Sequence, residues 1–185
     1  MKYVNTAVGT CTEDLSAAEA CWKDVPVMDF IHQVQMATVA TGLSTADAAL
    51  PLISVAAPFS RSADIPKGDV TIRDVAGLYI YDNTLYGKKL TGAQLRDYLE
   101  FAAKYYHRVP VGTAVDTATL TNANSFWDYM YDTAAGVEYE IDIAAAEGSR
   151  IKNLSYKGAA VTDDQVFVVA VNNYCLLYTS DAADE

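Results

Sequence analysis

Histidine and cysteine are the side chains best suited to bind metal ions or to act as nucleophiles, and this sequence contains few of them. The two histidines, His32 and His107, lie far apart, and the spacing of Cys11, Cys21 and Cys175 fits no metal-binding motif. A two-metal hydrolytic site usually needs several histidines together with carboxylates. We therefore expect no catalytic residue, no metal site and no bound cofactor in this chain, and we expect both histidines to be structural or surface residues.

The last residues, Cys175–Glu185, read CLLYTSDAADE and follow a strand-like run without any turn residues. The string matches the translation of a sequencing adapter, so we interpret 175–185 as an artefactual tail; the alternative is an ordinary acidic C-terminus. Under this interpretation we expect residues 1–174 to form one domain that is incomplete at its C-terminal end. The remaining cysteines, Cys11 and Cys21, could form a disulfide in an oxidising compartment or stay as buried free thiols.

The composition indicates one folded domain and excludes several classes of function. The chain has 185 residues, 51% of them hydrophobic, and its 13 tyrosines can pack a ring while keeping a hydroxyl for hydrogen bonds. Its net charge of −11 repels a nucleic-acid backbone, so we expect no DNA or RNA polymer as a partner. No apolar run reaches the roughly 18 residues that a membrane span needs, and residues 1–10 lack the apolar core of a signal peptide.

Helical and strand-like segments alternate along the sequence. The apolar spacing predicts a helix within 25–41, and a capping box formed by Thr91 and Gln94 predicts another within 90–106, with Leu95 and Leu99 on its buried face. Strands are predicted within 50–59, 138–143, 150–156 and 165–173, and a strand followed by a turn at Asp82 and Asn83 is predicted within 78–85. This alternation predicts a mixed α/β (α+β) fold in which helices flank a mixed sheet.

Four segments carry a resemblance to a known family. They are LPLISVAAPF (Leu50–Phe59), the run Gly68–Tyr106 with YDNTLY and LTGAQLRDYLE, the run Tyr129–Val161, and VFVVAVNNY (Val166–Tyr174). Over roughly residues 25–174 the sequence resembles the C-terminal domain of the 5′-nucleotidase family. The letters AAPF resemble the branch of bifunctional 2′,3′-cyclic-nucleotide 2′-phosphodiesterase/3′-nucleotidases in particular.

The resemblance implies a site that holds a nucleobase between two aromatic rings. The first ring falls on Tyr81, in YIYDN, and the second on Tyr174, in NNY; Asn83 matches a family asparagine near the edge of the base. Arg61 lies near the position of a family arginine on the phosphate side, and a surface arginine is the alternative there. Phe59 is expected in the pocket wall or in the core. Without the family, Tyr81 would be a strand tyrosine and Asn83 a turn residue.

Members of the family join this domain to an N-terminal metallophosphoesterase domain that holds two divalent metals and the catalytic residues. The histidine-rich motifs of that domain are absent here. The resemblance therefore implies the nucleotide-binding part of a hydrolase that is periplasmic, secreted or attached to the cell wall, with this chain inactive by itself. Two alternatives stay open: a non-catalytic nucleoside-binding surface module, and a relative that acts on a non-nucleotide substrate. Phe126 and Trp127 could edge the cleft or belong to the aromatic core.

Overall fold

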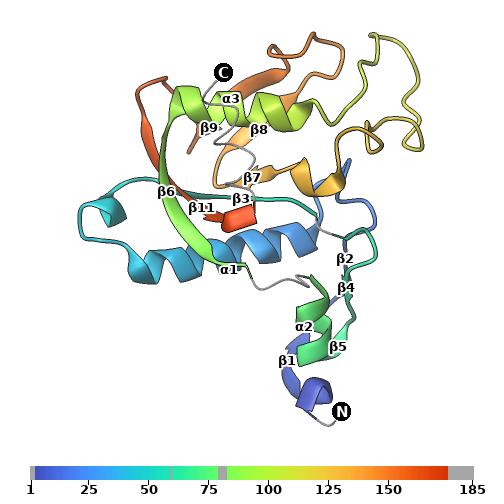
Figure 1. Ribbon diagram of the computed structural model, residues 1–185, viewed down its shortest axis with the longest axis vertical. Coiled ribbons are helices and arrows are strands. Elements are labelled where there is room, and N and C mark those ends of the chain that lie inside the picture. The colour runs from blue at the N-terminus through green and yellow to red at the C-terminus, as the bar shows by residue number, and fades with distance from the viewer. Residues whose placement is uncertain (1–2, 59, 79–82, 175–185) are drawn as a thin grey trace.

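The computed structural model describes residues 3–58, 60–78 and 83–174 and shows helices on both faces of a small mixed sheet (Figure 1). The elements run in the order η1 (Tyr3–Asn5), β1 (Ala7–Cys11), β2 (Leu15–Ser16), α1 (Pro26–Gly42), η2 (Asp47–Ala49), β3 (Leu52–Ala56), β4 (Asp64–Ile65), β5 (Gly68–Thr71), α2 (Ile72–Leu78), β6 (Leu85–Thr91), α3 (Gly92–Ala103), η3 (Asp128–Met130), β7 (Thr133–Ala135), β8 (Glu138–Ile141), β9 (Ile151–Tyr156), β10 (Ala159–Ala160) and β11 (Val166–Asn172). The predicted mixed α/β fold is confirmed.

The centre of the fold is a four-stranded sheet with the order β6-β11-β3-β7, in which β11 runs antiparallel to β6 and parallel to β3. Successive side chains of a strand point to opposite faces of the sheet. Val168 of β11 accordingly packs with Val39 of α1, whereas its neighbour Val169 packs with Leu95 and Leu99 of α3. Burial on both faces explains why this strand reads as an unbroken apolar run.

Local sequence signals set where the two long helices begin. α1 begins at Pro26, whose fixed φ and missing N–H suit the first turn of a helix. At α3 the Thr91 hydroxyl accepts a hydrogen bond from the Gln94 N–H (3.2 Å), and the Gln94 side chain accepts one from the Thr91 N–H (2.9 Å). Leu95 is 0% exposed and Leu99 1%, so the predicted capping box and buried face are confirmed.

The segment before α3 differs from the prediction. No strand is predicted over most of β6, and the strand predicted within 78–85 falls largely outside the described ranges, between Leu78, which ends the helix α2, and Leu85, which begins β6. β6 reads LYGKKLT, whose glycine and lysines have low β propensity, and its pairing with the whole of β11 overrides that local preference. Gly87 suits this strand because a Cβ there would lie 2.9 Å from a methyl group of Val39 in α1.

A second sheet, with the order β10-β9-β8, covers α3 and is joined to it by polar contacts. Glu100 of α3 accepts hydrogen bonds from the backbone N–H groups of Arg150 (3.0 Å) and Ile151 (2.7 Å), which fixes the start of β9 on the helix. Figure 1 also shows the paired strands β1 and β5 extending away from the central sheet together with α2. Within the described ranges, no helix is long and apolar enough to span a bilayer.

An aromatic cluster fills the core beside the end of α3. Its buried members are Cys21, Tyr105, Tyr106, Leu120, Phe126 and Tyr131. The rings of Tyr105 and Tyr131 are stacked with their centroids 4.7 Å apart, and the Tyr106 hydroxyl donates to the Cys21 carbonyl (2.8 Å). Tyrosine is used here as the composition predicts, with its ring in the core and its hydroxyl in a hydrogen bond.

Candidate ligand-binding site

The ladder between β6 and β11 brings Asn83 and Tyr174 to the same end of the central sheet. Its last strand pair is Leu85 opposite Asn172. The pairing continues one residue further, because the Asn173 N–H donates to the Thr84 carbonyl (2.8 Å) and the Thr84 N–H donates to the Asn173 side chain (2.9 Å). Asn83 and Tyr174 are the next residues beyond this pair, so two residues that are distant in sequence lie at one edge.

The side-chain amide of Asn83 differs from that of Asn173, on the same edge, in its hydrogen bonding. Its Nδ2 atom is buried, and within the described ranges it has no hydrogen-bond partner. A buried amide without a partner lowers stability by about 1–3 kcal/mol. A ligand that accepts hydrogen bonds from this amide would remove that cost, which makes Asn83 the clearest polar anchor at this edge.

Tyr174 belongs to a row of aromatic rings that also includes Tyr129 and Trp127; we call these three residues the aromatic strip. The ring of Tyr174 meets that of Tyr129 edge-on, with centroids 5.3 Å apart and an angle of 77°. Tyr129 lies nearly parallel to Trp127, with centroids 6.2 Å apart. Trp127 is 54% exposed, whereas Phe126 is 9% exposed and packs in the aromatic cluster. Of these two neighbours in sequence, Trp127 therefore lies on the surface and Phe126 in the core.

Arg61 makes its contacts with the protein itself. Its guanidinium binds the carboxylate of Asp128 through two hydrogen bonds of 2.7 and 2.9 Å, and it donates a third to the Tyr105 hydroxyl (2.7 Å). The hydroxyl of Tyr105 in turn donates to Asp128 (2.5 Å), and the guanidinium lies over the ring of Trp22. Arg61 is thus not a free surface arginine, and its partner Asp128 directly precedes Tyr129 of the aromatic strip.

The electrostatics of this contact keep both partners charged. Burial alone would raise the pKa of Asp128, but hydrogen bonds from Arg61 and Tyr105 hold that pKa below its usual value. The hydrogen bond to Asp128 also raises the pKa of Arg61. Burial and the bond to Asp128 raise the pKa of the Tyr105 hydroxyl, which therefore stays protonated and keeps donating. We call these three residues the Arg61 clamp.

Several residues named from the sequence lie outside the described ranges. They are Phe59, Tyr81 and the tail Cys175–Glu185. The expectation that Tyr81 and Tyr174 face one another across a cleft therefore stays a prediction, as do the role of Phe59 and the interpretation of the tail. Asn83, Arg61 and Tyr174 are described, and the first and last of these lie at one edge.

The histidines and cysteines occupy separate places in the structure. His32 is buried with Nδ1 3.0 Å from the Ser54 hydroxyl and Nε2 3.1 Å from that of Thr133, and burial lowers its pKa to about 4. His107 is exposed, so one histidine lies in the core and the other on the surface. Cys11 and Cys21 are both free thiols. In the part of the chain that the structure describes, no three His, Cys, Asp or Glu side chains are grouped to hold a metal, so these residues do not fit a metal centre.

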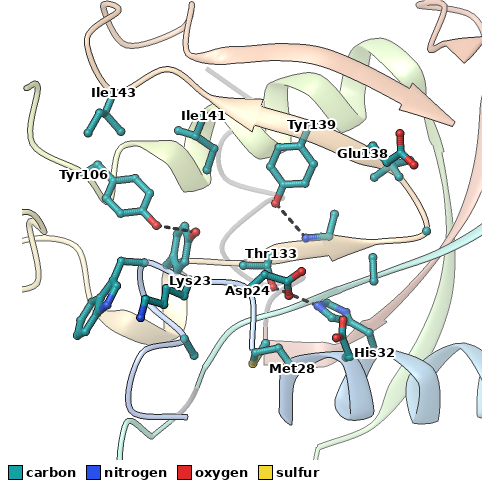
Figure 2. A pocket seen from close by; sticks show the side chains of 18 of the residues that line it. Lys23, Asp24, Met28, His32, Tyr106, Thr133, Glu138, Tyr139, Ile141 and Ile143 are labelled. Atoms are coloured by element: carbon teal, nitrogen blue, oxygen red, sulfur yellow. Dashed lines mark hydrogen bonds between the residues drawn. The ribbon is translucent and has the colours of Figure 1, made fainter. Parts of the chain in front are cut away.

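A cavity of about 760 Å³ lies elsewhere, between the start of α1 and the strands β7 and β8 (Figure 2). Its lining includes two internal contacts, His32 to Thr133 and the Tyr139 hydroxyl to the N–H of Ala134 (3.2 Å), and it also includes the charged side chains of Lys23, Asp24, Asp29 and Glu138. Asn83, Arg61 and Tyr174 do not line this cavity. The residues that the family resemblance names are thus separate from this cavity.

Comparisons with known proteins agree with this architecture. The sequence profile described as "5′-nucleotidase, C-terminal domain" matches residues 7–182. The chain is 31% identical to the trifunctional nucleotide phosphoesterase protein YfkN of Bacillus subtilis, covering 94% of this chain and 13% of that protein. It is 32% identical to the 2′,3′-cyclic-nucleotide 2′-phosphodiesterase/3′-nucleotidase of Haemophilus influenzae, covering 94% of this chain and 30% of that protein.

A solved structure shows the same fold. The crystal structure of a 5′-nucleotidase precursor from Thermus thermophilus superposes with a TM-score of 0.69 at 20% identity, covering 94% of this chain and 31% of that one. The chain thus spans less than a third of each of these proteins. The match over residues 7–182 shows that the chain belongs to the 5′-nucleotidase C-terminal domain family.

Proposed function

We propose that this chain is the nucleobase- and nucleotide-binding domain of a nucleotide phosphohydrolase, either a 2′,3′-cyclic phosphodiesterase/3′-nucleotidase or a 5′-nucleotidase. The observation that carries the proposal is the joint placement of Asn83 and Tyr174 at one end of the β6–β11 ladder, with the amide of Asn83 buried and unpaired within the described ranges. The names of the bacterial relatives support the class of substrate.

The two side chains supply complementary contacts for a nucleobase. A tyrosine ring stacks on the π-face that every base has, and each stack contributes about 1–3 kcal/mol. An amide carries both donors and an acceptor, so it can bind the polar edge of a base. With Tyr81 on the opposite side, as the resemblance implies, the base would lie between two rings.

The hydrolytic chemistry is proposed to belong to a separate metallophosphoesterase domain. Two divalent metals held there would supply an activated water and neutralise phosphate charge. The net charge of −11 makes the present domain poorly suited to binding phosphate alone, so we assign it orientation of the nucleoside part. Export of the parent protein to the periplasm or cell surface, which the resemblance implies, stays a prediction.

The proposal is tested by measuring binding to the purified chain. Isothermal titration with adenosine, AMP and ribose 5-phosphate separates recognition of the base from recognition of the phosphate. We expect adenosine and AMP to bind with similar affinity and ribose 5-phosphate to bind at least tenfold more weakly, because stacking needs the base. The chain should release no phosphate from AMP in the presence of divalent metals.

The variant Asn83→Leu tests the contribution of the amide itself, since leucine has a similar size without the amide. We expect it to weaken adenosine binding while the fold, followed by circular dichroism, is kept. Equal binding of all three ligands, or no binding of adenosine and AMP, would contradict the proposed function.

A further inference from the structure

We propose that Arg61 and Asp128 are positioning residues of the ligand site: their ion pair holds Tyr129 against Tyr174, so that the Tyr174 ring is fixed before the ligand arrives. This inference rests on the function proposed above and assigns a role to residues that do not themselves touch the base. It also replaces the expected contact of Arg61 with phosphate.

The clamp is anchored in the core at one end and in the aromatic strip at the other. Tyr105, which bonds to both Arg61 and Asp128, is 0% exposed and is stacked on Tyr131. Asp128 begins the short helix η3, and Tyr129 is its next residue. Holding the Asp128 side chain at two points therefore restrains the backbone that carries Tyr129.

The turn around Asp128 leaves Tyr129 little freedom. The Met130 N–H donates to the Trp127 carbonyl (2.9 Å), and the Tyr131 N–H donates to the Asp128 carbonyl (3.1 Å). Tyr129 lies inside these two hydrogen bonds, and its ring contacts Trp127 and Tyr174. A movement of Asp128 would therefore displace the ring that borders Tyr174.

The geometry of Arg61 suits this role better than phosphate binding. Its Nε and Nη2 atoms form a fork on the two carboxylate oxygens of Asp128, the planar geometry in which arginine binds carboxylates most strongly. Its face is also occupied, because the guanidinium lies 5.6 Å from the centroid of the Trp22 ring. A phosphate would have to compete with a carboxylate that is already bound at two points.

The expected effect of losing the clamp is a moderate loss of affinity. A ring that is free to move before binding must be immobilised by the ligand, and this weakens binding by about two- to tenfold per side chain. The loss should be the same for a nucleoside and a nucleotide, because it concerns the ring and not the phosphate.

The test measures adenosine and AMP binding to the 185-residue chain by isothermal titration for Arg61→Gln, Asp128→Asn and the double variant. We expect each single variant to lower the affinity for both ligands by the same factor, about two- to tenfold. The double variant should bind no more weakly than the single variants, because both substitutions act through one contact. A loss confined to AMP would show that Arg61 binds phosphate directly. Unchanged affinity for both ligands would show that the clamp only stabilises the fold. Either result overturns the inference.

Arg96→Gln is the matched control. Arg96 is as exposed as Arg61 (36% for both side chains) and also bonds a carboxylate at 2.7 Å, that of Asp163, but it lies at the opposite end of β11. Its removal should leave the affinity for both ligands unchanged. If the wild-type chain binds neither ligand, the proposed function and the inference fail together. If the wild-type chain binds and the clamp variants bind with the same affinity, the inference alone fails.

A second readout does not depend on ligand. The sequence has two tryptophans, so in a Trp22→Phe background, with excitation at a wavelength that tyrosine does not absorb, the fluorescence comes from Trp127 alone. Asp128→Asn should lower the anisotropy of Trp127 and raise its quenching by acrylamide, whereas Arg96→Gln should change neither. Tyr105→Phe, which removes only one hydroxyl of the clamp, should give a smaller change in the same direction. An unchanged Trp127 signal in a folded Asp128→Asn chain would overturn the inference.

Discussion

The two ends of the β6–β11 ladder are built from the same strands and differ in how their polar groups are paired. At the end where Thr91 lies opposite Val166, Thr91 and Gln94 form a reciprocal capping box, and Arg96 bonds Asp163. At the other end the buried amide of Asn83 has no partner among the described residues. The first end pairs its polar groups and so serves stability, whereas the second leaves a buried amide unpaired, as the proposed binding role would require.

The largest effect is expected at the Thr91 end of the ladder, from Gly92→Ala. A Cβ at Gly92 would lie 2.1 Å from the Thr162 carbonyl oxygen and 2.7 Å from a methyl of Val161, and neither backbone can move freely. We expect a loss of about 3 kcal/mol in the free energy of unfolding, measured with urea. Gly77→Ala is the control, because nothing lies within 4 Å of its Cβ position in α2. Equal stability of the two variants would remove the contrast between the ends.

His32 shows what a fully paired buried group does, in contrast to Asn83. Its folded-state pKa is lowered from 6.5 to about 4, so the unfolded chain binds more protons and stability falls as the pH drops below 6.5. From these values, we expect His32 to account for about 2 kcal/mol of the stability lost between pH 7.5 and pH 5. Urea unfolding of His32→Gln should show a correspondingly flatter pH dependence.

Tyr174→Ala directly tests the end of the ladder where Asn83 and Tyr174 lie. Removing the ring should weaken adenosine binding by about 1–3 kcal/mol, roughly five- to 150-fold, because one base stack is lost. Stability should change less than in Gly92→Ala, since Tyr174 is only partly buried. Titration calorimetry and urea unfolding of the same samples give both numbers. A variant with lower stability and unchanged affinity would assign the ring to the fold.

Asn83→Leu should produce the smallest change in stability, with an unusual sign. Replacing an unpaired buried amide by an apolar side chain of similar size should raise the free energy of unfolding by about 1 kcal/mol. The same variant should lose affinity for adenosine. A destabilised Asn83→Leu chain would mean that the amide is paired in solution, and the two ends would then be equivalent.

Sequence reasoning succeeded where the signal is local. The Thr91–Gln94 box lies within four residues, and the burial of Leu95 and Leu99 follows from helical spacing. Sequence reasoning missed the strand β6, because β6 is stabilised by β11, which lies far along the chain, and the glycine and lysines of β6 disfavour a strand.

Some described residues of the candidate site could be named from the sequence and others could not. Asn83 and Tyr174 came from the family resemblance, since no periodicity relates them. Asp128 and Tyr129 were missed, because the contact of Asp128 with Arg61 and that of Tyr129 with Tyr174 exist only in the folded chain. The exposed and buried members of the Phe126–Trp127 pair could not be distinguished for the same reason.

The register of the ladder also determines when the site can form during folding. Asn83 and Tyr174 become neighbours only after a long segment of chain has been closed into a loop, an event that is entropically costly and slow compared with the formation of a helix such as α3. Partly folded chains with local structure alone would contain the Thr91 cap and no site. A ligand at this edge would therefore bind the completed fold selectively and slow its unfolding more than it speeds its folding.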